Sequence, residues 1–405
     1  MPTKQVFLLG CVLSLFATTT FAADWLQFRG SDNSSVAASA KVPVDFTAEK
    51  NVAWKSPLVG KGVSGPIVVG KKVFVTASSG PVVQDRLHVL CFDTDSGKQL
   101  WHRQFWATGR CFHHPTSANA APTPASDGER VFAFFSSNDL ICLDLDGNLQ
   151  WYRGLGYDFP KAGNDVGMSS SPVVAGGAVV VQIENQGDSF AAGLDTLTGE
   201  TLWRETRKAS ANWASPALLR DATGKEVVLL QSPGVLTAHE PRSGKQVWKY
   251  DAQCSIIPSA TAAQDRVFLP AKGLTLLEAT ATTTSPTVAW ESNRLAPGNS
   301  SPVIVGDHVY ILSKAGVLAC GDCKTGEILW QQRLAGTFWA TPVVAGEHLY
   351  CINQDGKCFA VKLGAEKPED PPTSELGEQV LGSPAVSSDG LFIRTGQNLW
   401  KIAAK

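Results

Sequence analysis

The chain has 405 residues, of which 43% are hydrophobic and 18% are charged, and its formal net charge is −2 at pH 7. This balance excludes the strongly basic surface that nucleic-acid binding needs, so we expect no nucleic acid among its partners. The 37 glycines and 23 prolines favour a fold with many tight turns over one rich in long helices.

The first 22 residues predict a secretory signal peptide. Lys4 supplies a positive charge, residues 6–16 form an apolar stretch, and Thr20 and Ala22 offer small residues at the cleavage position. The stretch is shorter than the roughly 18 apolar residues of a membrane-spanning helix, and no later segment reaches that length. We therefore predict a periplasmic or secreted protein that is cut near Ala22 and has no transmembrane segment.

A tryptophan closes the same short phrase seven times. The phrase is clear from Asp93 to Trp101, where it reads Asp-Thr-Asp-Ser-Gly-Lys-Gln-Leu-Trp. Successive tryptophans lie 47, 50, 52, 45, 42 and 40 residues apart. A period of roughly 40 to 50 residues that carries only strand patterns is typical of propeller blades. The seven residues are Trp54, Trp101, Trp151, Trp203, Trp248, Trp290 and Trp330.

Each residue of the phrase has an expected role in a blade. The aspartate, Asp93 in the first copy, can accept hydrogen bonds from the amides of a turn. The tryptophan is expected to bury its ring between neighbouring sheets while its indole N–H donates to a carbonyl. The glycine suits the positive φ of a tight turn, and it recurs as Gly97, Gly199, Gly244 and Gly326.

The strand pattern predicts eight blades and a closed ring. The eighth unit ends near Trp400 after three strands, and Val52–Lys55 is a spare strand near the start of the chain. We therefore predict an all-β fold, an eight-bladed β-propeller of four-stranded antiparallel blades over residues 51–405, preceded by an N-terminal extension of residues 23–50. The Val52–Lys55 strand is expected to pair into the last blade and close the ring. The first strands are expected after Pro66, Pro122 or Pro124, Pro172, Pro216, Pro258, Pro302, Pro342 and Pro384.

The repeated phrase resembles the signature of a known family. An apolar residue, Asp, two variable positions, Thr/Ser-Gly-Lys/Glu, two more positions and Trp mark the pyrroloquinoline-quinone (PQQ)-like repeat, and Phe92–Trp101, Leu194–Trp203 and Gly321–Trp330 carry it here. The chain resembles quinoprotein-type eight-bladed β-propellers, and by size their BamB-like secreted bacterial members. The Trp-Leu-Gln-Phe-Arg-Gly sequence that begins at Trp25 is similar to the start of such members.

The resemblance also states what a catalytic member would need. Catalytic members are similar in binding the quinone on the propeller axis, with a calcium ion held by Glu, Asn and Asp and two adjacent, bridged cysteines. This chain has no Cys-Cys pair. Glu184, Asn185 and Asp188 are residue types that suit Ca²⁺, although an ordinary polar turn is the favoured interpretation. We therefore predict no catalytic residue, no metal and no cofactor, with PQQ and calcium as the alternative.

Two tryptophans outside the phrase stand in the links that lead into predicted innermost strands. Trp213 and Trp339 shortly precede Pro216 and Pro342, so we expect them around one mouth of the central channel. There they either stack a planar ligand or grip a partner peptide, or they fill the funnel as packing.

Two groups of cysteine and histidine residues are further candidates. The longest departure from the repeat, residues 105–121, contains Cys111, His113 and His114. A surface insertion is the favoured interpretation, and a metal site is the alternative. Cys351 and Cys358 flank a predicted hairpin loop and either form a cross-strand disulfide or stay reduced.

These features favour a scaffold over an enzyme. We expect a monomeric, secreted or periplasmic propeller whose loop-rich face binds a protein or another cell-envelope macromolecule. The alternative is a quinoprotein oxidoreductase that binds PQQ and calcium and uses Glu184, Asn185 and Trp339. A third hypothesis is a metal-dependent enzyme at His113 and His114.

Overall fold

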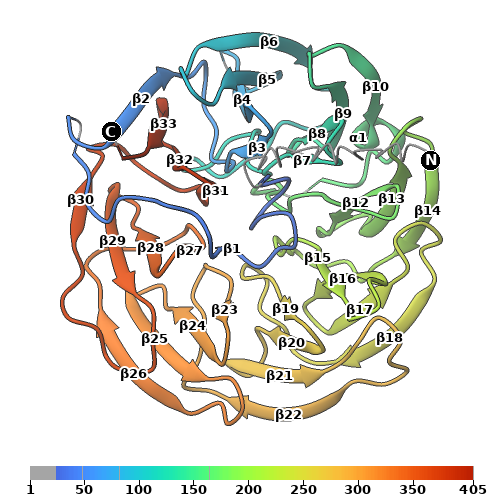
Figure 1. Cartoon of the computed structure of the whole chain (residues 1–405). Coiled ribbons are helices and arrows are strands. Elements are labelled where there is room, and N and C mark those ends of the chain that lie inside the picture. The colour runs from blue at the N-terminus through green and yellow to red at the C-terminus, as the bar shows by residue number, and fades with distance from the viewer. Residues whose placement is uncertain (1–23, 48, 82, 164, 405) are drawn as a thin grey trace, which may run out of the picture.

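The computed structural model describes residues 24–47, 49–81, 83–163 and 165–404, so the predicted signal peptide and its cleavage site at Ala22 lie outside the described residues. Eight antiparallel sheets stand around a central axis (Figure 1). Within the described ranges the chain forms 33 strands and one short helix, α1 (Leu155–Asp158). The predicted all-β, eight-bladed architecture is confirmed. None of the helices in this part of the chain is long and apolar enough to cross a membrane.

Blades 1 to 4 follow one another along the chain, and each is built from its innermost to its outermost strand. Blade 1 contains β3 (Ile67–Val69), β4 (Lys72–Ser79), β5 (Arg86–Asp93) and β6 (Gln99–Trp106). Blade 2 contains β7 (Ala125–Ser126), β8 (Arg130–Phe134), β9 (Asp139–Asp144) and β10 (Leu149–Gly154). Blade 3 contains β11 (Val173–Ala175), β12 (Ala178–Ile183), β13 (Phe190–Asp195) and β14 (Thr201–Thr206). Blade 4 contains β15 (Ala217–Arg220), β16 (Glu226–Ser232), β17 (Val235–His239) and β18 (Gln246–Asp251).

Blades 5 to 8 complete the ring. Blade 5 contains β19 (Thr261–Ala263), β20 (Arg266–Leu269), β21 (Leu274–Glu278) and β22 (Thr287–Ser292). Blade 6 contains β23 (Val303–Val305), β24 (His308–Leu312), β25 (Val317–Asp322) and β26 (Ile328–Arg333). Blade 7 contains β27 (Val343–Ala345), β28 (His348–Ile352), β29 (Lys357–Lys362) and β30 (Thr373–Glu375). Blade 8 contains β31 (Ala385–Ser387), β32 (Gly390–Arg394), β33 (Asn398–Ile402) and the N-terminal strand β2 (Val52–Pro57).

The ring closes as the sequence predicts. Strand β2 pairs antiparallel with β33, with Lys55 opposite Trp400, and so supplies the fourth strand of blade 8. The backbone hydrogen bonds of the last sheet therefore join the two ends of the chain and give blade 8 its four strands. The sequence did not predict β1 (Val36–Ala37), which runs parallel to β27 and adds a fifth strand to blade 7.

The seven repeated tryptophans link neighbouring blades. Each indole N–H donates to a backbone carbonyl in a turn of the next blade, at 2.8–3.1 Å. The glycine of that turn lies under the ring, because a Cβ added to Gly97 would come within 2.5 Å of Trp54. The glycine therefore serves two needs, the positive φ of 70° at Gly97 and the close approach of the ring. The acceptor carbonyls belong, in chain order, to Thr94, Leu145, Thr196, Pro241, Thr280, Cys323 and Gly364.

The aspartate of the phrase holds the same turn from within. In blade 1 the Asp93 carboxylate accepts hydrogen bonds from the backbone N–H groups of Asp95 and Ser96 and from the Ser96 hydroxyl. These bonds, led by that from the Ser96 hydroxyl, lower the pKa of Asp93. Because the core consists of clusters between adjacent sheets, such as the one that joins Phe132 of blade 2 to Val181 of blade 3, the turns and rings of the phrase set the spacing of the blades.

Of the two alternatives for Cys351 and Cys358, the structure has the reduced thiols, because the two residues differ by one residue of register from a directly opposite pair. Cys351 lies opposite Phe359, and Ile352 lies opposite Cys358. Because directly opposite residues share a face of the sheet, the two thiols point to opposite faces and belong to different core clusters. All eight cysteines in the described ranges are free thiols.

Candidate functional site

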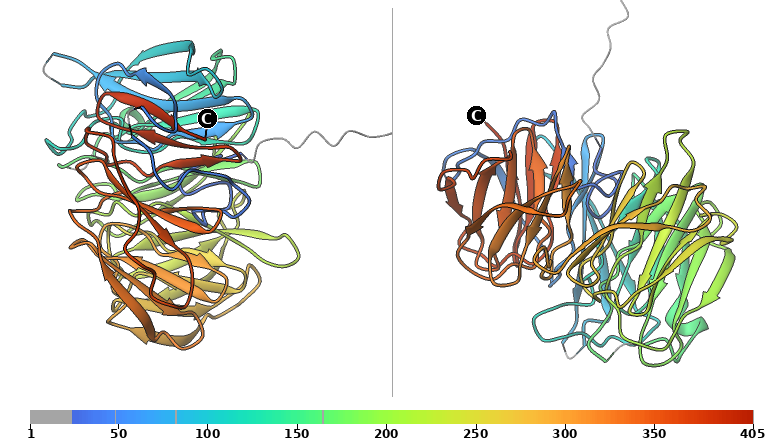
Figure 2. Two further views of the ribbon diagram at one scale, coloured as in Figure 1. Left: turned by 60° about the vertical axis from the view of Figure 1, so that its left-hand side comes forward. Right: turned by 90° about the horizontal axis from the view of Figure 1, so that it is seen from below.

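The N-terminal extension crosses the centre of the ring at one end of the channel (Figure 1). It makes hydrogen bonds to the innermost strand of one blade after another, and the loops around residues 107–121 lie at the opposite end of the ring (Figure 2, right). The contacts reach blades 1, 2, 3, 4, 5, 7 and 8 through Trp25 with Val68, Leu26 with Ser126, Gln27 with Val174, Asn33 with Leu218, Arg29 with Ala260, Ser35 with Val344 and Lys41 with Ser388.

Arg29 anchors the extension in blade 5. Its side chain is 1% exposed, and the guanidinium donates to the Ala260 carbonyl at 2.9 Å and to the Thr261 hydroxyl. Burial lowers the pKa of Arg29 to about 10, which still leaves the group charged at pH 7. The Phe-Arg-Gly part of the opening motif therefore has a structural role in closing the channel.

Seven hydroxyl groups form a ring around the channel, which we call the hydroxyl ring. Each occupies the position two residues before the start of an innermost strand and accepts a hydrogen bond at 2.9–3.0 Å from the backbone N–H of the matching residue in the preceding blade. Blade 1 has Gly65 at this position and adds no hydroxyl. The ring consists of Thr123, Ser171, Ser215, Ser259, Ser301, Thr341 and Ser383.

The sequence prediction found the neighbours of this ring but not the ring itself. In seven blades the ring position, or Gly65, is followed directly by the proline that opens the first strand. The prediction was wrong in blade 5, where Ala260 takes the proline position and Pro258 precedes Ser259. The Ser/Thr-Pro dipeptide was the available signal, and it recurs from Thr123 to Ser383.

A cavity of about 480 Å³ lies on the axis between the extension and the open mouth. The positions of the lining residues relative to the hydroxyl ring show how deep each lies along the axis. Trp213 and Trp339 stand two residues before the hydroxyl ring, and most contacts of the extension lie three residues after it, or about 10 Å deeper along a strand. Phe28 of the extension lines the cavity, so the extension forms its floor. None of the described residues that line the cavity is Asp, Glu, Lys or Arg.

Trp213 and Trp339 both line this cavity, on links that enter blades 4 and 7. The Trp213 indole N–H donates to the Gly167 carbonyl at 2.8 Å, and that of Trp339 donates to the Gln354 side chain at 3.1 Å. Trp339 is 38% exposed. Because both N–H groups are engaged, the ring faces are the parts left to meet a ligand, and the Lys314 ammonium lies over the Trp339 ring at 5.8 Å from its centroid.

The structure separates the predicted metal ligands of the 105–121 segment. His114 lines the cavity, where its ring contacts the Thr116 hydroxyl at 2.8 Å, whereas the His113 ring contacts the backbone carbonyl of His114. The Cys111 thiol accepts a hydrogen bond from Asn119 at 3.4 Å. In the described part of the chain, no three His, Cys, Asp or Glu side chains come together in a group that could hold a metal ion.

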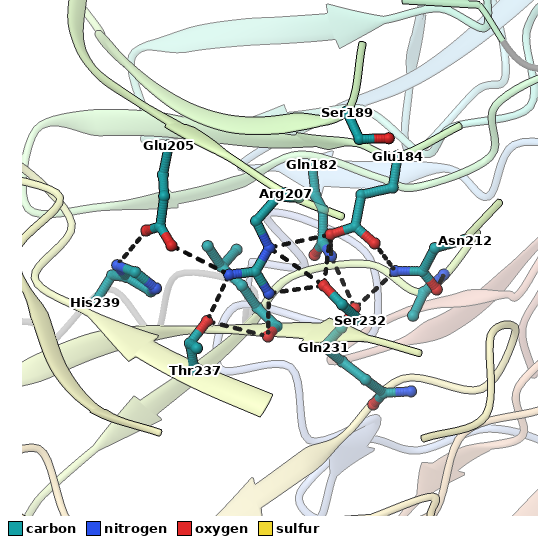
Figure 3. A network of polar contacts seen from close by, with 12 residues as sticks. Gln182, Glu184, Ser189, Glu205, Arg207, Asn212, Gln231, Ser232, Thr237 and His239 are labelled. Atoms are coloured by element: carbon teal, nitrogen blue, oxygen red, sulfur yellow. Dashed lines mark hydrogen bonds and ion pairs between the residues drawn. The ribbon is translucent and has the colours of Figure 1, made fainter. Parts of the chain in front are cut away.

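Glu184 lies in a buried polar network between blades 3 and 4 (Figure 3). Its carboxylate accepts hydrogen bonds from Gln182 at 2.8 Å, Arg207 at 3.2 Å, Asn212 at 3.0 Å and the Ser232 hydroxyl. The side chains of Glu184 and Arg207 are 0% and 4% exposed, so this is a fully desolvated ion pair. The Arg207 guanidinium supplies the positive charge that the buried carboxylate needs.

The residues present do not fit a calcium–quinone site. The Asn185 side chain closes its own turn through Gly187 and Asp188, and the Asp188 carboxylate pairs with Arg204 at 2.8 Å. A calcium ion at Glu184 would have to displace Arg207. PQQ carries carboxylates, and the described lining of the axial cavity offers no Lys or Arg to neutralise them.

The network instead holds two links that face the cavity. Asn212 donates to Glu184 and to the Gln231 carbonyl, and its own side-chain oxygen accepts the N–H of Ala214, so the backbone on both sides of Trp213 is fixed. Gln231 donates to the carbonyls of Ser255 and Pro258, which flank Ile257 in the next link. Sequence reasoning missed this function of Glu184, because the partner residues lie in four separate segments.

Comparison with solved structures finds several proteins of similar fold. BamB from Moraxella catarrhalis is 16% identical, with a TM-score of 0.57, and the match covers 89% of this chain and 97% of that one. A quinohemoprotein alcohol dehydrogenase from Comamonas testosteroni is 13% identical, with a TM-score of 0.67 over 95% of this chain and 81% of that one. A europium-containing methanol dehydrogenase is also 13% identical, with a TM-score of 0.65 over 93% and 90%. At these identities the likeness concerns the fold.

The search of curated proteins found no match. A family profile described as outer membrane protein assembly factor BamB matches residues 31–188, 161–255 and 270–367, which together make up most of the chain. The profile spans the repeated blades described above, and the structural neighbours include both BamB and dehydrogenases of the same fold. The chain therefore belongs to the PQQ-like β-propeller family of the outer membrane protein assembly factor BamB.

Proposed function

We propose that this protein is a non-catalytic scaffold of the cell envelope that binds a protein partner at the open mouth of the channel. The observation that carries the proposal is the exposed apolar surface there. Phe112, Ile257 and Trp339 are 49%, 36% and 38% exposed, although they are large apolar side chains. Large apolar side chains that are left exposed at one end of a molecule are typical of interaction sites. The description of the family as an assembly factor supports a protein partner.

The chemistry of the site supports a scaffold over an oxidoreductase. The Glu184 carboxylate is neutralised by Arg207, and none of the described lining residues of the cavity is Asp, Glu, Lys or Arg. Phe28 of the extension lines the cavity at the end away from the mouth. A periplasmic or secreted location belongs to the same proposal, and it rests on the family and on the first 22 residues.

Site-specific photo-crosslinking tests the partner. A benzophenone amino acid replaces Phe112 at the mouth in one variant and Leu197 in the other. Leu197 is 64% exposed on the turn between β13 and β14, which lies at the end of blade 3 away from the mouth. After irradiation of native cells we expect discrete protein adducts from position 112 and none from position 197. Identical adducts at both positions, or adducts at 197 alone, would overturn the proposal.

A second measurement addresses catalysis. The purified protein is incubated with PQQ and Ca²⁺, and the reduction of an artificial electron acceptor is followed with alcohols and aldose sugars. We expect no turnover above that of a Trp339→Ala variant. Turnover that requires both PQQ and Ca²⁺ and is lost in Glu184→Gln would establish the quinoprotein alternative.

A further inference from the structure

The axial cavity has a chemical character that partner binding does not explain. Its volume of about 480 Å³ lies within the range of small-molecule sites. The hydroxyl ring surrounds it on seven of eight sides, and two indole rings stand at its mouth. Apolar side chains, among them Met168, Ile257 and Leu381, form further parts of the described wall.

The hydroxyl ring leaves hydrogen-bond donors available. Each of its oxygens accepts one backbone N–H, and in the described part of the chain none of its seven O–H groups donates to a protein acceptor. A hydroxyl has one proton to donate and can accept two hydrogen bonds. Seven donors around the axis therefore suit a ligand that carries oxygen atoms around its whole perimeter.

The charge of the wall restricts the ligand further. Among the described lining residues the only titratable side chain is His114, at the mouth, and each of the others is uncharged. Burying an ionised ligand without a partner of opposite charge costs several kcal/mol. The two indoles offer flat apolar faces, since their N–H groups are bound to Gly167 and Gln354. The ligand is thus neutral, rich in hydroxyl groups, and flat on one face.

We infer that this cavity binds a neutral sugar unit at the end of a glycan. A pyranose ring carries hydroxyl oxygens around its rim and presents C–H groups on its faces, which stack on indole rings. The floor formed by Phe28 makes the cavity blind, so it takes the end of a glycan and not its middle. This site goes beyond the proposed partner surface, because it shares only Ile257 and Trp339 with that surface and extends from them into the ring, below the loops that carry Phe112.

The first arm of the test compares neutral and charged sugars of the same shape. Glucose, galactose, mannose and N-acetylglucosamine are titrated into the purified protein, and tryptophan fluorescence and saturation-transfer NMR report binding. We expect at least one neutral sugar to bind, and glucuronic acid, which differs from glucose by a carboxylate, to leave both signals unchanged. Binding of glucuronic acid as tight as that of glucose, or no response to any neutral sugar, overturns the inference.

The second arm locates the ligand. Trp339→Ala should weaken binding by about tenfold, while Trp339→Phe should retain most of it because an aromatic face remains. The control is Trp106→Ala, since Trp106 is 59% exposed on the outermost strand β6 and lies away from the cavity. Equal binding by Trp339→Ala and the wild type overturns the inference. Tight binding of PQQ in place of sugars does so as well.

The outcome is separate from that of the partner test. Sugar binding is measured on the purified protein alone, and the photo-crosslink at position 112 reports on a protein in the cell. Failure of the sugar titration leaves adducts at position 112 intact, and absence of adducts leaves the sugar titration intact.

Discussion

The two ends of the central channel are built in different ways. At one end the extension is packed into the ring, with Trp25 and Phe46 buried and Arg29 bonded to blade 5. At the other end Phe112 and Trp339 stand exposed on loops that differ from blade to blade. A ring of similar blades does not by itself distinguish its two ends in this way. The segments outside the repeat create the difference. The extension stabilises the ring at one end, and the loops at the other end present exposed side chains for binding.

The extension at the closed end also contributes to the interface between blades 7 and 8, which lacks a repeat tryptophan. Blade 7 ends in β30 (Thr373–Glu375), which has no tryptophan to reach blade 8. Phe46 of the extension lies in the core cluster shared by these two blades, and its backbone N–H donates to the Ser374 hydroxyl at 2.8 Å. The extension therefore supplies a large buried ring to the interface where the repeat does not.

Removing one phenyl ring at each end is the strongest test of this comparison. We expect Phe46→Ala to lower the free energy of unfolding by about 3–5 kcal/mol, the usual cost of emptying a buried aromatic site. Phe112→Ala should change it by less than about 0.5 kcal/mol, because that ring is 49% exposed. Denaturant unfolding of the two variants measures both values. Equal losses would show that the extension is not a structural part of the ring.

Removing one arginine at each end gives a smaller effect. Arg29→Met should cost about 1–3 kcal/mol of stability, since the buried acceptors at Ala260 and Thr261 lose their donor. Arg110→Met at the open end removes an ion pair with Asp165 whose side chains are 51% and 69% exposed. That pair should contribute about 0–1 kcal/mol. Thermal unfolding at two salt concentrations distinguishes them, because only the Arg110 effect should fade with salt.

The smallest expected difference between the two ends is the effect of a buried thiol on stability at alkaline pH. Burial raises the pKa of Cys142, inside blade 2, from 9.0 to about 12. A raised folded-state pKa contributes stability that is complete below pH 9 and is lost as the pH rises toward 12, because the unfolded chain releases the proton first. At pH 10, Cys142→Ala should reduce the alkaline loss of stability by about 1 kcal/mol.

Two controls accompany the thiol prediction. Alanine is the residue found at the matching position Ala238, which faces Trp248 as Cys142 faces Trp151, so the substitution suits the fold. Cys111→Ala at the open end should have a smaller effect, because this thiol is only half-buried and solvent reduces its shift. Identical pH profiles for the wild type and Cys142→Ala would contradict the prediction.

The repeat made the blades predictable, and two features, one within a hairpin and one between blades, show where prediction stopped. The tryptophan phrase, the eight blades and the closing strand at Val52 followed from local patterns with a period. The Cys351–Cys358 hairpin did not, because its loop shifts the register by one residue and so reverses one face. Glu184 was placed in a polar turn or a calcium site, and its partner Arg207 became visible only when blades 3 and 4 lay side by side.

The sequence by itself determined the blade and the number of blades, since both rest on residues within about 40 to 50 positions of one another that recur around the axis. It also predicted how the ring closes, because the eighth unit has three strands and Val52–Pro57 is a spare strand at the other end of the chain. It also marked Trp213 and Trp339 as exceptions to the repeat. Only the tertiary structure decided that the extension closes one end of the channel, that seven hydroxyls join into a ring, and that the axial cavity has an uncharged lining. These features depend on residues from up to eight blades that meet at one axis. Such residues lie far apart in the sequence, so no local pattern predicts that they come together.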